Sequence, residues 1–96
     1  MKRDQVFKSL VKMKDELSSK YNLTKLGVFG SFARNEQSDV SDLDIVVELA
    51  RSNMFDLIGI KQEIEEQLNL PVDIVQYREK MNSFLKRRID NDALYL

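Results

Sequence analysis

Residues 25–49, KLGVFGSFARNEQSDVSDLDIVVEL, decide the fold because they hold two short apolar segments joined by a polar one. The first segment, KLGVFG at residues 25–30, is bounded by glycine and predicts a strand. The second, DIVVEL at residues 44–49, is rich in β-branched side chains and predicts another strand. Between them, residues 31–34 predict a short helix and residues 35–41 predict a polar loop.

Apolar side chains at helical spacing mark the sequence on both sides of this stretch. We expect Asn22 to stop the first helix, Asn53 to cap the start of the next, and Pro71 to break it. After Pro71, the segment VDIVQ predicts a third strand. The further predicted elements are helices over residues 3–21, 53–68 and 79–96 and a strand over residues 72–76.

Three strands interleaved with helices predict an α+β domain, in which helices flank a small mixed sheet of three or more strands. The first two strands are joined by about a dozen residues, which permits an antiparallel or a mixed sheet, so the strand order stays open. The 96 residues fit a single domain over residues 1–96. A domain this small has a thin stability margin, so it could gain from a homo- or hetero-oligomer.

The composition excludes several kinds of chemistry. The chain has no cysteine and no histidine, which removes disulfides, thiolate nucleophiles, Cys/His zinc sites and histidine-based triads. A net charge of −1 argues against a nucleic-acid partner held by phosphate contacts. No apolar run approaches the roughly 20 residues that span a bilayer, and there is no signal-peptide core. We therefore expect a cytoplasmic protein without a membrane segment, whose chemistry uses carboxylates, hydroxyls, cations and a bound ion.

Gly30-Ser31 lies where a predicted strand becomes a helix. Glycine would let a phosphate approach the backbone closely, and the start of a helix with a serine hydroxyl offers hydrogen-bond donors to an anion. The alternative is an ordinary turn glycine followed by an N-cap serine.

Asp42-Leu43-Asp44 leads into the second strand. Side chains alternate along a strand with a period of two, so the two carboxylates point to one side, with Cα atoms about 7 Å apart. Such a pair can converge on Mg²⁺, which prefers oxygen ligands. The alternative is a solvated acidic loop.

Asp73 is an acid inside an otherwise apolar strand. Burying a lone carboxylate is costly unless it is paired or bound to metal, although an edge strand could expose it to water. Combined with the two preceding motifs, it would complete a nucleotidyl-transfer site. Two divalent ions there would hold a triphosphate and lower the pKa of an attacking hydroxyl.

The GS pair at residues 30–31 and the DLD motif at residues 42–44, with ten residues between them, resemble the Gly-Ser-x10-Asp-x-Asp pattern of DNA polymerase β-like nucleotidyltransferases. The fuller stretches around both motifs look like the minimal nucleotidyltransferases. Asp73 lies where that family keeps a third carboxylate, and residues 89–96 resemble its C-terminal helix. The likeness covers almost the whole chain.

The resemblance implies roles for these residues. Ser31, with the backbone of Gly30, would hold the β- and γ-phosphates of ATP. Asp42 and Asp44 would ligate both Mg²⁺ ions. Asp73 would ligate the catalytic ion and favour deprotonation of the acceptor hydroxyl.

Further expectations concern Arg34, Asn35 and residues 86–88. Arg34 matches a family arginine that can reach the triphosphate, but a surface charge is an equal alternative. Asn35 stands where the family often has glycine, and asparagine also tolerates the left-handed backbone of such a turn. Residues 86–88, Lys-Arg-Arg, are interpreted as a solvated helix face near a helix end, where cations suit the helix dipole.

The acceptor follows from the resemblance alone. Similar minimal proteins are antitoxins that add AMP to a tyrosine of a HEPN-domain toxin and silence it. Two alternatives stay open: an antitoxin that neutralises its partner by binding, and a transferase acting on a small molecule or a nucleic acid. The acidic pI of about 5.4 weighs against the nucleic-acid version.

Overall fold

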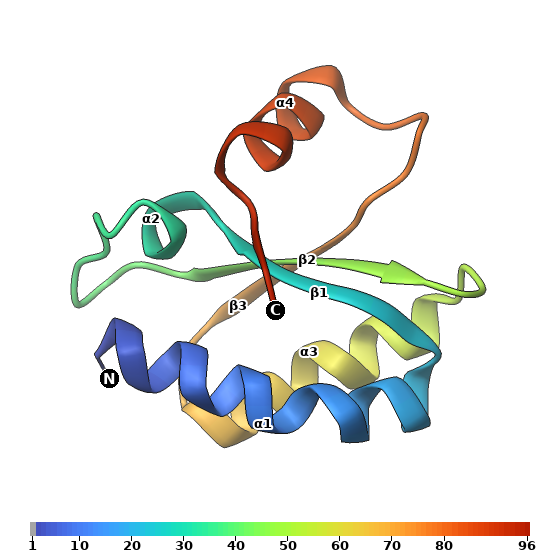
Figure 1. Ribbon diagram of the computed structural model, residues 1–96, viewed down its shortest axis with the longest axis horizontal. Coiled ribbons are helices and arrows are strands. Elements are labelled where there is room, and N and C mark those ends of the chain that lie inside the picture. Colours follow the sequence, from blue (N-terminus) through green and yellow to red (C-terminus); the bar gives the residue numbers. More distant parts are fainter. Residues whose placement is uncertain (1) are drawn as a thin grey trace.

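One mixed sheet runs through the middle of the molecule (Figure 1). The computed structural model describes residues 2–96, and the sheet within them has the strand order β3-β2-β1-β4. β1 pairs antiparallel with both β2 and β4, whereas β2 pairs parallel with β3. The strands are β1 (Leu23–Phe29), β2 (Leu43–Leu49), β3 (Val72–Gln76) and β4 (Leu94–Tyr95). The α+β fold with a mixed sheet is therefore confirmed.

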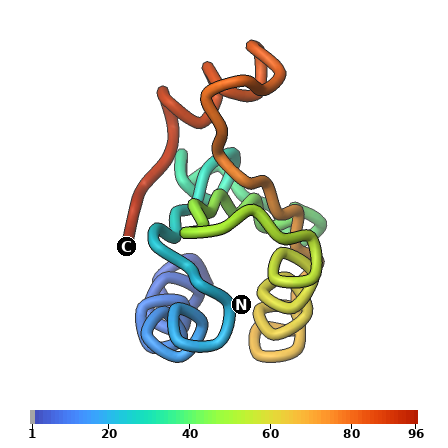
Figure 2. The backbone as a smooth tube through the Cα atoms, turned by 90° about the vertical axis from the view of Figure 1, so that its right-hand side faces the viewer, coloured from blue at the N-terminus to red at the C-terminus, as the bar shows by residue number. Residues whose placement is uncertain are grey.

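Helices cover both faces of this sheet (Figures 1 and 2). α1 and α3 lie side by side under one face, and α4 lies over the other. α2 is a single turn between β1 and β2. The helices are α1 (Arg3–Tyr21), α2 (Gly30–Ala33), α3 (Met54–Leu68) and α4 (Ser83–Asp92). No helix among residues 2–96 is both long and apolar enough to cross a membrane.

Asparagines mark several helix ends. α1 ends at Asn22 with φ 57°, in the left-handed region that asparagine tolerates. The Asn53 side chain accepts a hydrogen bond of 2.8 Å from the backbone N–H of Phe55 and so caps α3. Asn35 has φ 59°, so the turn after α2 is left-handed, as the sequence predicts. These local features are confirmed. The sequence could predict them because each depends on neighbouring residues alone.

The two faces of β2 enter different apolar clusters. Its odd-numbered residues join the large cluster with α1 and α3, in which Leu10 and Ile64 are fully buried. Val46 packs instead with Phe29 and with Ile89 of α4 in a smaller cluster. Because side chains alternate along a strand, the even-numbered side chains of β2 lie on the α4 face of the sheet.

The C-terminal segment differs from its prediction. The expected helix over residues 79–96 is wrong at both ends, because α4 covers only Ser83–Asp92 and Leu94–Tyr95 forms β4. β4 pairs with β1, which would otherwise leave a row of unpaired backbone groups at the edge of the sheet. A Cβ at Gly27 would lie only 2.9 Å from the Tyr95 ring, so the absence of a side chain there lets β4 lie close.

Candidate functional site

Asp44 and Asp73 are direct partners on the parallel strands β2 and β3. Each lies one residue from a strand position that packs towards α1 and α3, so both carboxylates belong to the α4 face. Neighbouring strands are about 4.8 Å apart, which places two like charges close together. The Asp44 side chain is 20% exposed, whereas Asp73 is exposed.

The surroundings of Asp44 disfavour its negative charge. Burial raises the pKa of this carboxyl above its usual 3.8, the charge of Asp73 raises it further, and that of Asp42 adds to the effect. The guanidinium groups of Arg88 and Arg34 act in the opposite direction. Clustered carboxylates with this excess of negative charge are a donor set that suits a hard divalent cation such as Mg²⁺.

Asp42 lies just before the start of β2 and is exposed. Within residues 2–96, no three acidic side chains converge closely enough to hold one metal ion. The structure thus brings two of the three predicted acids into register and places the third two residues away along the chain. Their shared role as metal ligands stays a prediction.

Gly30 of the Gly-Ser turn lies directly against the Asp44 side chain. Its φ is 71°, and a Cβ there would lie 2.1 Å from the Asp44 Oδ2 atom. Any side chain at position 30 would therefore face both a strained backbone and a clash with the carboxylate. The close approach that the sequence suggests for a phosphate is made here by the Asp44 side chain.

Ser31 is the second residue of α2 and is half-buried, so the alternative in which it is an N-cap is wrong. Phe29 holds the N-cap position and pairs with Asp44 across β1 and β2. Ser31 therefore lies two residues beyond the strand partner of Asp44, at the same end of the sheet. α2 has only four residues, so its own dipole contributes little to anion binding.

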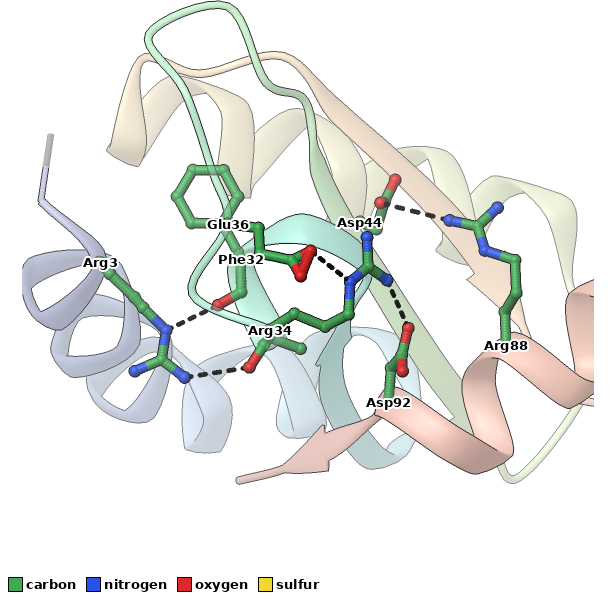
Figure 3. A network of polar contacts seen from close by, with 8 residues as sticks. Arg3, Phe32, Arg34, Glu36, Asp44, Arg88 and Asp92 are labelled. Atoms are coloured by element: carbon green, nitrogen blue, oxygen red, sulfur yellow. Dashed lines mark hydrogen bonds and ion pairs between the residues drawn. The ribbon is translucent and has the colours of Figure 1, made fainter.

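Two arginines flank Asp44 (Figure 3). Arg34 forms ion pairs with Glu36 at 3.0 Å and with Asp92 of α4 at 2.6 Å. Arg88 extends from α4 towards Asp44, with 4.0 Å between its Nη2 and the Asp44 Oδ2. The interpretation of residues 86–88 as a solvated face therefore did not predict that Arg88 points towards Asp44. Its place directly before the buried Ile89 was a usable signal, because it puts the side chain at the edge of the packed face.

A cavity of about 280 Å³ lies away from these residues, between the start of α1 and the loop before β2. Lys2, Phe32, Gln37 and Leu70 contribute to its wall. Phe32 belongs to the cluster on the α1 and α3 side, and none of the candidate acids lines the cavity. Asp44 and Asp73 therefore belong to the α4 face of the sheet and not to this cavity.

The nucleotidyltransferase domain is the family whose model matches this sequence, over residues 10–96. The chain belongs to that family. A Methanocaldococcus jannaschii relative of this nucleotidyltransferase, named "Putative protein adenylyltransferase MJ0435", is 41% identical over 76 residues, covering 78% of this chain and 81% of its own. "Protein adenylyltransferase MntA" of Thermococcus cleftensis is 27% identical over 94 residues, covering 97% of this chain and 94% of its own.

Solved structures share the fold of this nucleotidyltransferase. One described as a "putative minimal nucleotidyltransferase" aligns with a TM-score of 0.82 at 27% identity, over 100% of this chain and 97% of its own. An AMPylated Shewanella oneidensis HEPN toxin in complex with its MNT antitoxin aligns with a TM-score of 0.70 at 18% identity, covering 98% and 71%. A toxin–antitoxin complex with AMP-PNP aligns at 0.72 and 22%, covering 88% and 69%. The last two show likeness of fold alone.

Proposed function

We propose that this nucleotidyltransferase transfers AMP from ATP to a hydroxyl, that of a tyrosine, on a HEPN toxin, and so acts as an antitoxin. The acceptor oxygen forms a bond to the α-phosphorus, the bond from that phosphorus to the bridging oxygen breaks, and pyrophosphate leaves. The observation that carries the proposal is the in-register pair of Asp44 and Asp73 beside the Gly30 turn. The names of the two adenylyltransferase relatives support the choice of AMP and of a protein acceptor.

The acids have distinct tasks in this proposal. Asp42 and Asp44 would ligate both Mg²⁺ ions, and Asp73 would ligate the catalytic ion and favour deprotonation of the acceptor hydroxyl. Bound Mg²⁺ neutralises the charge of the triphosphate and lowers the pKa of the attacking hydroxyl. The raised pKa of Asp44 supports this role, because a bound cation would stabilise a carboxylate charge that burial first, and the charge of Asp73 second, disfavour.

The turn positions the nucleotide. Ser31 and the backbone of Gly30 bind the phosphates, at the end of β1 where the chain lies against Asp44. The protein contributes orientation and charge here rather than a covalent intermediate. Arg34 is less available for a phosphate contact than Ser31 and Gly30, because its guanidinium already forms ion pairs with Glu36 and Asp92.

The test mixes the purified chain with ATP, Mg²⁺ and the product of the neighbouring gene, which this proposal expects to be a HEPN protein. Mass spectrometry of the HEPN protein should show the added mass of AMP on a tyrosine. Asp44→Asn should remove the added mass. Asp39→Asn is the matched control, because Asp39 is an exposed acid of the loop and lines the separate cavity.

A second outcome would favour neutralisation by binding. If the double variant Asp42→Asn with Asp44→Asn leaves the toxin unlabelled yet fully silenced, contact rather than transfer is the function. The fold shared with toxin–antitoxin complexes makes this alternative worth testing in the same experiment. Labelling of a small molecule with no labelling of the HEPN protein would refute the protein acceptor.

A further inference from the structure

Arg88 connects both halves of the candidate site. Its Nη2 lies 4.0 Å from the Asp44 Oδ2, and its guanidinium carbon lies 5.7 Å from the centre of the Phe29 ring. Phe29 is the residue directly before Gly30, so Arg88 lies beside both the Asp44 carboxylate and the residue that leads into the Gly-Ser turn. The next residue, Ile89, is 1% exposed and anchors this part of α4 to the sheet.

Arg88 differs from Arg34 in how much of its guanidinium is in use. A guanidinium has five N–H donors, and those of Arg34 contact two carboxylates at 3.0 and 2.6 Å. Within residues 2–96, Arg88 forms one ion pair, at 4.0 Å, and its side chain is 55% exposed. Its donors are therefore available to a ligand that binds above the turn.

We propose that Arg88 is a positioning residue that changes partner when the nucleotide binds. It pairs with Asp44 in the free protein and with oxygens of the triphosphate in the nucleotide complex. This inference rests on the function proposed above and names a residue for it. A divalent cation at Asp44 removes the attraction that holds Arg88 there, and a phosphate offers the planar guanidinium a better-matched anion.

This change of partner predicts that removing Arg88 shifts the affinity for a metal ion and the affinity for a triphosphate in opposite directions. In the free protein, Arg88 competes with a cation for Asp44, so its removal should tighten the binding of a metal ion alone. In the nucleotide complex, Arg88 contributes a contact to the triphosphate, so its removal should weaken the binding of a triphosphate. A residue that merely stabilised α4 would change both affinities in the same direction.

The experiment compares Arg88→Gln with Arg87→Gln, which makes the same change of charge at an exposed neighbour in α4. Electron paramagnetic resonance measures the affinity for Mn²⁺ alone, and calorimetry measures the affinity for AMP-PNP with Mg²⁺ and for AMP. We expect Arg88→Gln to weaken AMP-PNP binding about tenfold, to tighten Mn²⁺ binding several-fold, and to leave AMP binding almost unchanged. Arg87→Gln should change each affinity less than about twofold.

Arg88→Lys keeps the charge and loses the planar fork, so it should bind AMP-PNP with an affinity between those of the parent and Arg88→Gln. The proposal is overturned if both variants bind AMP-PNP like the parent, or if metal and triphosphate affinities fall together. In either case a parent protein that binds AMP-PNP and labels the HEPN protein keeps its proposed function. A parent that binds no AMP-PNP refutes the proposed function and this inference together.

Discussion

The two faces of the sheet use the same strands for different purposes. The face towards α1 and α3 carries the large apolar cluster, with Leu10, Ile60 and Ile64 fully buried. The face towards α4 carries a small cluster around Ile89, and beside it two acids in register and an arginine. Alternation along β2 therefore lets one strand secure the fold with one set of side chains and present charge with the other.

The largest effect should come from the charged face. Asp44→Asn should lower the rate of AMP transfer about 100-fold or more, because it removes a charge needed at the reacting phosphate. Transfer is measured from the rate at which the HEPN protein gains mass. If the variant transfers AMP at the parent rate, the α4 face is not the active face.

Truncation of one buried isoleucine on each face should separate the role of one face in stability from the role of the other in nucleotide binding. Ile64→Ala should lower the free energy of unfolding by about 2–5 kcal/mol, because it opens a cavity in the large cluster. Ile89→Ala should cost near the low end of this range, since its cluster is small, and it should also weaken AMP-PNP binding by freeing the part of α4 that carries Arg88.

Urea unfolding of both isoleucine variants, with calorimetric binding of AMP-PNP, checks this pair. Equal losses of stability accompanied by equal losses of affinity would contradict a division of labour between the faces. Ile64→Val, which removes one methyl group, serves as a mild control on the same face and should cost about 0.5–1.5 kcal/mol.

Removing the charge of Asp44 should raise the stability of the protein, although it lowers the rate of AMP transfer. Burial first, and the charge of Asp73 second, raise the pKa of Asp44 in the folded protein, so its ionised form costs stability. Asp44→Asn should therefore raise the free energy of unfolding at neutral pH by about 0.5–1 kcal/mol, as expected when one of two like charges on adjacent strands is removed.

The pH dependence follows from that sign. Below the usual Asp pKa of 3.8, Asp44 is neutral in both the folded and the unfolded chain, so the gain from Asp44→Asn should vanish. It should appear as the pH rises through the raised pKa of the folded protein. Thermal unfolding in buffers without divalent ions measures the difference, and a variant less stable than the parent at neutral pH would refute the stated repulsion.

The smallest effect should come from Arg34. Its ion pairs with Glu36 and Asp92 lie at the surface, where solvent and salt screen them, so each contributes little to stability. Arg34→Gln should therefore weaken AMP-PNP binding less than Arg88→Gln does and lower the melting temperature by a few degrees at most. Calorimetry of the two variants under one buffer ranks them directly, and the reverse ranking would assign the phosphate contact to Arg34.

Local sequence was enough to predict much of this fold. β3 has the predicted bounds, residues 72–76, and Asn22 and Asn53 mark helix ends because each acts through its own backbone and nearest neighbours. The expected same-side placement of Asp42 and Asp44 rests on strand alternation, and it stays a prediction because Asp42 lies just before the start of β2. Motif spacing, helped by family resemblance, nominated the Gly-Ser turn and the three acids, whose roles stay predictions.

Two features depended on distant contacts that local sequence does not contain. The predicted last helix extends through residues 94–95, yet these residues pair with β1 because an open sheet edge at Gly27 and Val28 accepts them. Arg88 stands in a run of cations that is typical of a solvated face. Only the packing of Ile89 against Phe29 and Val46 turns it towards Asp44.

The fit between Gly30 and Asp44 also limits how such a chain can evolve. A Cβ at position 30 would lie 2.1 Å from the Asp44 carboxylate, so the two positions constrain each other during descent. A lineage that replaces Asp44 by a shorter residue removes this steric barrier, and the left-handed backbone at φ 71° then becomes the remaining pressure to keep glycine. Divergence at position 30 should accordingly follow loss of the acid at position 44 and mark descendants that have given up transfer.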